Sequence, residues 1–181
     1  MALLQVVRVG DPVLRQVAAP VADPADPAIA ALAQSMIETM EAEPGVGLAA
    51  PQVGQSLRLI VMRIVASRAE AMEEEQHRHM ALVNPTVEPL GAEIELGWEG
   101  CLSVPDLRGV VPRASRVRYH GWLLDGSEVE GEAAGFQARI LQHETDHLNG
   151  IVYLDRMQDM STLGYDAEIV AAARAAQAAS A

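Results

Sequence analysis

The chain has 181 residues, of which 50% are hydrophobic and 21% are charged, with a formal net charge of -12. This size and composition fit one compact domain spanning residues 1–181 and exclude intrinsic disorder for most of the chain. The acidic balance disfavours general binding to nucleic acids or anionic membranes, because a negative surface repels phosphate groups. All 13 basic residues are arginine, which excludes chemistry that needs a lysine nucleophile.

Cys101 is the only cysteine, so no disulfide can form within the chain and a secreted scaffold held by disulfides is excluded. Residues 1–10 lack the charged start and the apolar run of a signal peptide. No apolar stretch reaches the roughly 18 residues that indicate a membrane span. We therefore expect a soluble intracellular protein.

The first predicted helix begins at Asp26 and Pro27. Asp26 can cap the free amides of the first turn, and a proline is tolerated at the first helical position. The helix is expected to end near Ala42, because Pro44 and Gly45 follow. Apolar residues recur along one face at three- and four-residue steps, and they are Ile29, Leu32, Met36, Ile37 and Met40.

A glycine-bearing stretch, residues 45–52, leads into an apolar run over residues 57–65 that is typical of a buried strand. Residues 67–79 are polar and rich in glutamate, which predicts a solvated surface loop or short helix. His77 and His79 have a spacing that a metal site can use, but no third ligand lies near them in sequence. We therefore interpret this segment as a charged insertion.

Short apolar or alternating runs over residues 81–124 are interrupted by prolines and glycines, which predicts several short antiparallel strands. Residues 125–126 (Asp-Gly) are a hairpin turn signal. Helical spacing returns over residues 136–148, and residues 149–150 (Asn-Gly) are a typical helix stop. The alanine-rich tail, residues 166–181, predicts a helix with a frayed end.

The predicted helix over residues 136–148 contains the pattern HExxH. His143 and His147 are four residues apart, so both imidazoles project from one helix face and can bind one metal ion. Glu144 lies beside them and is suited to transfer a proton. The alternative, two surface histidines at a chance spacing, is disfavoured because apolar positions flank the motif.

A catalytic metal site of this kind needs a third protein ligand and one position for water. No histidine or cysteine follows His147, whereas Cys101 stands upstream in the segment EGCLS. A thiolate is a strong ligand for a divalent ion, and Gly100 lets the backbone come close. A lone cysteine is more commonly a small buried hydrophobic residue, but this setting makes Cys101 the candidate third ligand.

Three segments together make the chain resemble the peptide deformylases. Residues 45–52 read GVGLAAPQ, residues 99–103 read EGCLS and residues 142–148 read QHETDHL, in that family's order and at its spacings. Each motif alone is modest support, whereas the three together are highly specific. The resemblance extends from about Val7 to about Met157. It implies an α+β fold in which antiparallel strands surround a central metal-bearing helix.

The resemblance implies a metallohydrolase that removes the N-formyl group from the N-terminal methionine of newly made polypeptides and releases formate. It implies one Fe²⁺ per chain, with Zn²⁺, Ni²⁺ or Co²⁺ as substitutes. Glu144 would take a proton from the attacking water and pass it to the leaving nitrogen. The family's oxyanion donors, a glutamine side chain and the amide after the cysteine, fall on Gln52 and Leu102. The implied metal ligands are Cys101, His143 and His147.

The resemblance also implies which residues surround the substrate and hold the site. Gly45 and Gly47 would let an extended substrate pair with the backbone beside the metal, although these glycines are also compatible with a plain turn. The positions that would surround the methionine side chain, Val46, Glu99, Phe136 and Ile140, are also compatible with ordinary core. Arg113 with Glu99, and Asp146 with a nearby arginine, would form ion pairs that hold the ligand segments. The implied substrate-binding residues are Val46, Gly47, Glu99, Gly100, Phe136 and Ile140.

Two other functions stay open on the sequence. A zinc peptidase acting on internal peptide bonds would use His143, Glu144 and His147, but it would leave Cys101 and Gln52 unexplained. A catalytically silent relative would keep the metal as a structural staple or bind ribosomes or nascent chains. Structural zinc sites normally have about four protein ligands, and the pattern offers fewer.

The implied partners are N-formyl-methionyl nascent chains in a bacterial cytoplasm. Some members of the family dock on ribosomes through a basic C-terminal helix. Here Arg174 is the only cation in residues 167–181, and Glu168 opposes it. We therefore expect at most a weak or transient ribosome contact, and no general nucleic-acid or membrane partner.

Overall fold

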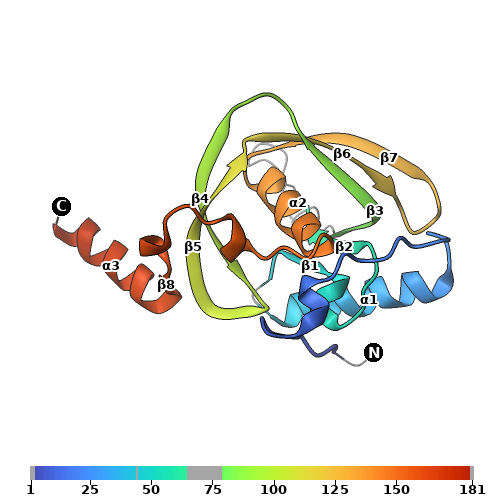
Figure 1. The fold of residues 1–181 in the computed structure, drawn as a ribbon, viewed down its shortest axis with the longest axis horizontal. Helices are drawn as coiled ribbons and strands as arrows, with labels where there is room; N and C mark the ends of the chain where they lie inside the picture. The colour runs from blue at the N-terminus through green and yellow to red at the C-terminus, as the bar shows by residue number, and fades with distance from the viewer. Residues whose placement is uncertain (1–2, 44, 65–78, 180–181) are drawn as a thin grey trace.

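The computed structural model describes residues 3–43, 45–64 and 79–179. In these residues the chain forms two antiparallel sheets, three α-helices and four short 3-10 helices. Figure 1 shows α2 in the centre, between the strands of the two sheets, with α1 outside one sheet and α3 at the C-terminal end. The α+β fold with antiparallel strands around a central helix is confirmed.

The larger sheet has the order β1-β2-β3-β6-β7, and the smaller sheet has the order β4-β5-β8. The larger sheet consists of β1 Gly47–Ala49, β2 Leu59–Arg63, β3 His79–Pro89, β6 Arg116–Trp122 and β7 Glu128–Ala134. The smaller sheet consists of β4 Ile94–Cys101, β5 Val104–Ala114 and β8 Gly164–Tyr165. The α-helices are α1 Pro27–Ala42, α2 Gly135–Leu148 and α3 Asp166–Ala179. The 3-10 helices are Pro12–Arg15, Ala50–Val53, Tyr153–Arg156 and Met160–Thr162.

The three predicted helices are present. In α1 the Asp26 side chain accepts a hydrogen bond from the Ala28 amide at 2.8 Å, and Pro27 is the first helical residue. α2 begins one residue before the predicted start and ends at Leu148, where the Asn-Gly stop follows. α3 continues to Ala179, and the last two residues of the tail lie outside the described residues. No helix among the described residues is long and apolar enough to cross a membrane.

Strand β2 is buried on both faces, which explains its nearly continuous apolar sequence. Leu59 and Val61 pack in the cluster that α1 shares with the sheet, whereas Ile60 and Met62 pack in the cluster around α2. The predicted strand over residues 57–65 is thus confirmed at its centre, residues 59–63. The larger sheet therefore lies between α1 and α2, and apolar contacts with one face of the sheet hold α2 in place.

The prediction of only short strands over residues 81–124 is wrong, because β3 and β5 each have 11 residues. In β3 the register against β6 shifts between Val83 and Thr86, and Asn84 has a φ of 50°. This bulge absorbs Pro85, which cannot donate a backbone hydrogen bond to a regular ladder. The Asn84 side chain accepts a hydrogen bond from the Val21 amide at 2.8 Å, so the bulge also anchors the N-terminal segment.

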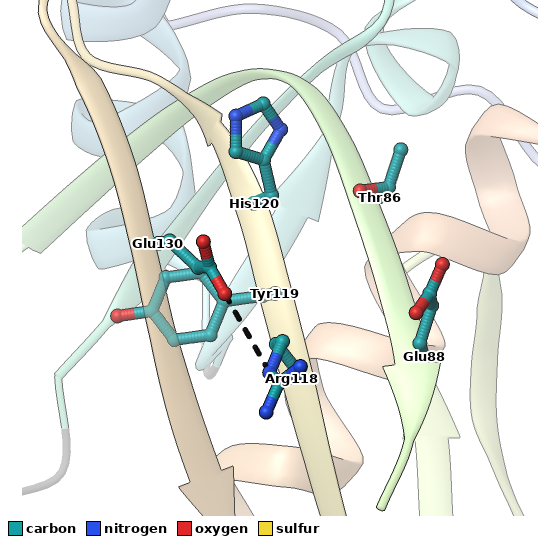
Figure 2. Close-up of a pocket in the computed structure, with 6 residues that line it drawn as sticks. All are labelled: Thr86, Glu88, Arg118, Tyr119, His120 and Glu130. Atoms are coloured by element: carbon teal, nitrogen blue, oxygen red, sulfur yellow. Dashed lines mark ion pairs between the residues drawn. The ribbon is translucent and has the colours of Figure 1, made fainter.

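The predicted turn at residues 125–126 is present between β6 and β7. Figure 2 shows a hollow on strands β3, β6 and β7, where Arg118 of β6 lies 3.5 Å from Glu130 of β7. At least half of each side chain is exposed, so this ion pair contributes little to stability. The hollow is lined by Thr86, Glu88, Arg118, Tyr119, His120 and Glu130.

Most of the acidic segment lies outside the described residues, including His77. His79 begins β3, where its Nε2 lies 3.3 Å from a Glu41 carboxylate oxygen of α1. The interpretation of residues 67–79 as a charged insertion therefore stays a prediction.

Candidate metal centre

Three side chains from two elements meet between the sheets. His143 and His147 project from α2, and Cys101 ends β4. Their potential ligand atoms all lie within 4.8 Å of one another, and the Cys101 Sγ lies 3.3 Å from the His147 Nε2. The two imidazole rings are 5.0 Å apart between centroids. The spacing of HExxH on a helix thus places both rings beside the thiol, as predicted.

Cys101 reaches this position because the β4–β5 hairpin is irregular at its turn. Gly100 pairs with Arg108, but Cys101 pairs with Val104, so the register shifts between the two residues. A bulge of this kind redirects a side chain out of the regular strand alternation. The hairpin thereby aims the thiol at α2.

The donor set fits a divalent metal ion. One thiolate and two imidazoles suit Zn²⁺, Fe²⁺ and related ions, and three protein ligands leave a fourth position for water. The Glu144 Oε2 is buried and has no hydrogen-bond partner among the described residues. A buried polar atom needs such a partner, and a water or substrate beside the metal would provide it.

Glu144 lies against the backbone of β1. Burial raises the pKa of the Glu144 carboxyl to about 7 in the metal-free protein. A Cβ atom on Gly47 would lie 2.3 Å from the Glu144 Oε1, so only glycine allows β1 to approach this closely. The segment 45–52 therefore contacts the HExxH motif directly, through Gly47 and Glu144.

Gln52 is held in one orientation by its own loop. Its Oε1 accepts a hydrogen bond from the Ala49 amide at 2.8 Å, which directs its Nε2 toward the metal centre. That nitrogen lies 3.3 Å from the Cys101 Sγ and 3.4 Å from the Ser103 Oγ. Leu102 is in the adjacent turn of the β4–β5 hairpin. Both predicted oxyanion donors thus lie beside the candidate ligands.

A cleft of about 680 Å³ opens on the metal centre, a volume typical of ligand sites. Ile140 is 3% exposed at its base, whereas Val46 and Phe136 are 37% and 52% exposed at its edge. The cleft also receives residues of the N-terminal segment, including Leu4 and Arg8. All the residues predicted to bind substrate line it, namely Val46, Gly47, Glu99, Gly100, Phe136 and Ile140.

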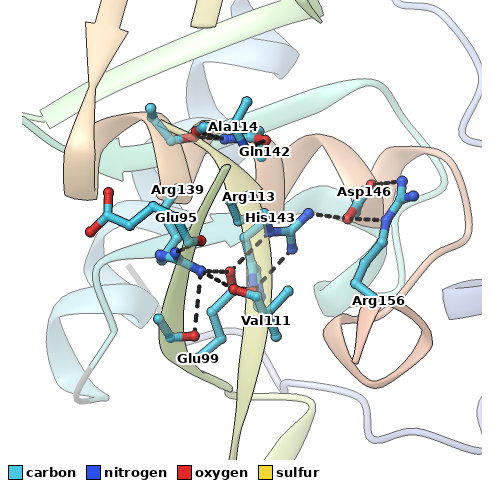
Figure 3. A network of polar contacts seen from close by, with 12 residues as sticks. Glu95, Glu99, Val111, Arg113, Ala114, Arg139, Gln142, His143, Asp146 and Arg156 are labelled. Atoms are coloured by element: carbon cyan, nitrogen blue, oxygen red, sulfur yellow. Dashed lines mark hydrogen bonds and ion pairs between the residues drawn. The ribbon is translucent and has the colours of Figure 1, made fainter. Parts of the chain in front are cut away.

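A buried ion-pair network lies behind the ligands (Figure 3). Arg113 donates two hydrogen bonds to Glu99, at 2.9 and 3.0 Å, and one to Asp146 at 2.5 Å. Arg156 binds the same Asp146 at 2.7 and 3.0 Å. The Glu99 Oε2 lies 2.8 Å from the His143 Nδ1. The sequence predicted that Asp146 pairs with a nearby arginine, and in the structure it pairs with two, Arg113 and Arg156.

The Glu99 carboxylate stays charged although it is 6% exposed. Burial alone would raise the pKa of this carboxyl, but hydrogen bonds from His143 and Arg113 outweigh it and lower the pKa to about 2. Because an ionised carboxylate can only accept hydrogen bonds, the His143 Nδ1 donates to Glu99, and Nε2 is the ring atom that would bind a metal.

Sequence reasoning missed two residues of this centre. Arg139 lies one turn before His143 on α2 and donates a hydrogen bond to Glu99 at 2.9 Å. Tyr153 is 1% exposed and its ring stacks on His143 at 6.2 Å between centroids. An arginine on a helix face shared with Phe136 and Ile140 was the available signal for Arg139, whereas Tyr153 had none.

The chain is similar in sequence and in structure to proteins of one family. Residues 3–162 match the family model described as polypeptide deformylase. Peptide deformylase 2 of Bordetella bronchiseptica is 46% identical over 160 residues, which cover 88% of this chain and 90% of that protein. The crystal structure of peptide deformylase from Thermotoga maritima is similar with a TM-score of 0.78 and 37% identity, covering 88% of this chain and 100% of that one. A Met-Ala-Ser-bound class I type b peptide deformylase from Acinetobacter baumannii has a TM-score of 0.77 and 39% identity, covering 86% of this chain and 99% of that one.

Proposed function

This chain belongs to the peptide deformylase family, and we propose how its own residues carry out deformylation. Its activity is the metal-dependent hydrolysis of the N-formyl group from the N-terminal methionine of newly made polypeptides. The observation that carries the proposed mechanism is that three distant motifs converge on one cleft, with Cys101, His143 and His147 within ligand distance of one another. A zinc peptidase would leave Cys101 and Gln52 without a role.

When bound, the metal supplies Lewis acidity, which lowers the pKa of a water and polarises a carbonyl oxygen. The ligands would be the Cys101 thiolate and the Nε2 atoms of His143 and His147. Glu144 accepts the proton of the attacking water, and its partnerless buried Oε2 supports this role. Glu144 then returns the proton to the leaving nitrogen, which yields formate and a free amine.

Gln52 and Leu102 stabilise the oxyanion that develops on the formyl oxygen. The Gln52 amide is already oriented by the Ala49 N–H, so it pays no reorganisation cost during the reaction. The Leu102 N–H is the second donor, in the turn directly after Cys101. Both donors belong to backbone segments that the sheets hold in place.

The cleft binds the substrate's methionine side chain and the adjacent backbone. Phe136 and Ile140 line it from α2, Gly47 from β1 and Gly100 from β4, and Val46 lines it from the segment just before β1. Exposed backbone along these segments is suited to pair with an extended peptide. The Met-Ala-Ser-bound relative supports a peptide of this kind as the ligand.

Residues 1–181 act as a single catalytic domain. α2 contacts strands of both sheets, and the ligand set needs both, because Cys101 comes from the smaller sheet. The three relatives named above are bacterial, which supports a bacterial cytoplasm as the place where nascent chains meet this enzyme.

The native metal is Fe²⁺. The ligands alone do not select iron, because the affinity of such sites rises from iron to zinc, so the family resemblance carries this choice. Fe²⁺-loaded enzyme should release formate from N-formyl-Met-Ala-Ser under argon but leave the acetylated peptide intact. Chelation should abolish the activity, and Ni²⁺ or Co²⁺ should restore it in an air-stable form.

In air the iron enzyme should lose activity, because Fe²⁺ beside a thiolate reacts with oxygen and Cys101 becomes oxidised. Formate release over time and mass spectrometry of the Cys101 peptide measure both effects. Equal, air-stable turnover with iron and zinc, with an unmodified thiol, would contradict the ferrous assignment and leave deformylation standing. Absence of formate release with every metal would contradict the function itself.

Glu144→Ala should reduce turnover by more than the roughly 10²- to 10⁴-fold range of one acid-base step, because two proton transfers share this group. Metal content should stay near one equivalent. Gly47→Ala should act in the same direction by displacing the carboxylate, since its Cβ would lie 2.3 Å from the Oε1. Retention of more than a tenth of the activity by Glu144→Ala would rule out the role.

Gln52→Leu should reduce kcat by roughly 10²- to 10³-fold, the range for loss of one oxyanion donor, with KM little changed. Steady-state kinetics with a formylated tripeptide measure both constants. An effect on KM alone would assign Gln52 to ground-state binding instead.

Ribosome contact is weak or transient at most. In α3 the only cation is Arg174, and Asp166 is already paired with Arg108 at 2.7 Å. We expect little cosedimentation with ribosomes at physiological salt. Strong cosedimentation that disappears on deletion of residues 167–181 would show the opposite.

A further inference from the structure

Arg139 is a buried cation directly beside the metal centre. It is 7% exposed and lies one turn before His143 on α2. Its guanidinium donates hydrogen bonds to the Glu99 Oε1 at 2.9 Å, and to three backbone carbonyls (Figure 3). Those carbonyls belong to Glu95 at 2.8 Å, Val111 at 2.9 Å and Gly97 at 3.4 Å. The charge thus joins α2 to both strands of the β4–β5 hairpin.

Gly97 and Arg139 are matched in shape. A Cβ atom on Gly97 would lie 2.7 Å from the Arg139 Nη2 and 2.8 Å from its Cζ. Real Cβ atoms essentially never approach other atoms this closely, so a larger residue at position 97 would force the guanidinium or the strand to shift. The strand therefore carries a glycine where the arginine crosses it.

The hydrogen bond from Arg139 is the fourth that the Glu99 carboxylate accepts. Oε1 accepts from Arg113 and Arg139, each at 2.9 Å, and Oε2 accepts from Arg113 at 3.0 Å and His143 at 2.8 Å. A carboxylate has about four lone-pair positions, so all of them are used. The carboxylate therefore cannot rotate without breaking a bond, and this fixes the His143 ring.

We propose that Arg139 is a positioning residue for the metal centre, acting through Glu99 on the orientation of His143. This role rests on the proposed function of that centre. Arg113 alone holds both Glu99 oxygens from one side, whereas Arg139 holds Oε1 from α2, the helix that also carries His143. Carboxylate partners of metal-binding histidines tune affinity in this way.

Arg139→Met should weaken metal affinity by roughly 10- to 100-fold, the range found for such outer partners. Competition between the folded protein and a chelator for Zn²⁺ measures the affinity, and the visible spectrum of the Co²⁺ form reports the ligand geometry. We expect a changed spectrum, a lower kcat and an unchanged KM for a formylated tripeptide. Arg139→Lys keeps the charge without the planar fork and should lie between wild type and Arg139→Met.

Gln142→Leu is the matched control. The Gln142 side chain joins α2 to β5 through hydrogen bonds of 3.0 Å to the amide and the carbonyl of Ala114. Among the described residues, it makes no hydrogen bond to Glu99. This variant should lose thermal stability but keep wild-type metal affinity and the wild-type Co²⁺ spectrum. An equal loss of affinity in Gln142→Leu would reduce Arg139 to general packing and overturn the proposal.

Two further variants keep the proposal testable if Arg139→Met does not fold. Gly97→Ala removes no charged group and should reproduce the weaker metal affinity by displacing the guanidinium. Adding Arg139→Lys to Glu99→Gln should cost less affinity than adding it to wild type, because the two residues act in series. Additive losses would overturn the proposal.

The outcomes separate this role from the enzyme's function. If wild type releases formate while the Arg139 and Gly97 variants keep wild-type affinity and spectrum, the positioning role is wrong and deformylation stands. If wild type releases no formate with any metal, the function is wrong, whatever the variants do to metal affinity.

Discussion

The buried carboxylate of Glu99 is the interaction on which the site depends. It lies at the end of β4, receives Arg113 from β5 and receives His143 and Arg139 from α2. A buried charge is unfavourable unless it is fully paired, so each of these elements is tied to the others by the requirement to satisfy it. The metal ligand Cys101 is two residues further along β4, and its place follows from that junction.

This arrangement explains why the centre needs two sheets. The larger sheet holds α2 through one apolar cluster, which includes Leu141 and Leu148 of α2 with Ile60 and Leu82 of the sheet. Such contacts fix where the helix lies but are not directional. The hydrogen bonds to Glu99 fix how the helix is rotated toward the hairpin, because they require defined donor geometry. Apolar burial thus sets the location of the two histidines, and the hydrogen bonds to Glu99 set their orientation.

The parts of the site that could be predicted are those that depend on local sequence. HExxH fixes two ligands by helix geometry, and Asp26-Pro27 fixes the start of α1 by capping. The family resemblance supplied the convergence of residues 45–52 and 99–103 on that helix, which no local rule contains. Residues whose roles depend on tertiary register were missed, as Arg139 shows.

The prediction of strand lengths was wrong for a related reason. Prolines and glycines break strands only where a backbone donor or a side chain is required, and tertiary structure decides this. Pro85 sits in a bulge that the Asn84 side chain stabilises through Val21. Gly97 sits where a guanidinium crosses the strand. These two residues accommodate specific contacts within continuous strands, whereas Pro89 and Gly91 mark the real break between β3 and β4. The glycines Gly47 and Gly100 also line the cleft, and Gly47 lets β1 lie against Glu144. Main-chain hydrogen bonds to an extended peptide give affinity, whereas pockets for its side chains give specificity, so these glycines bear on the first of the two.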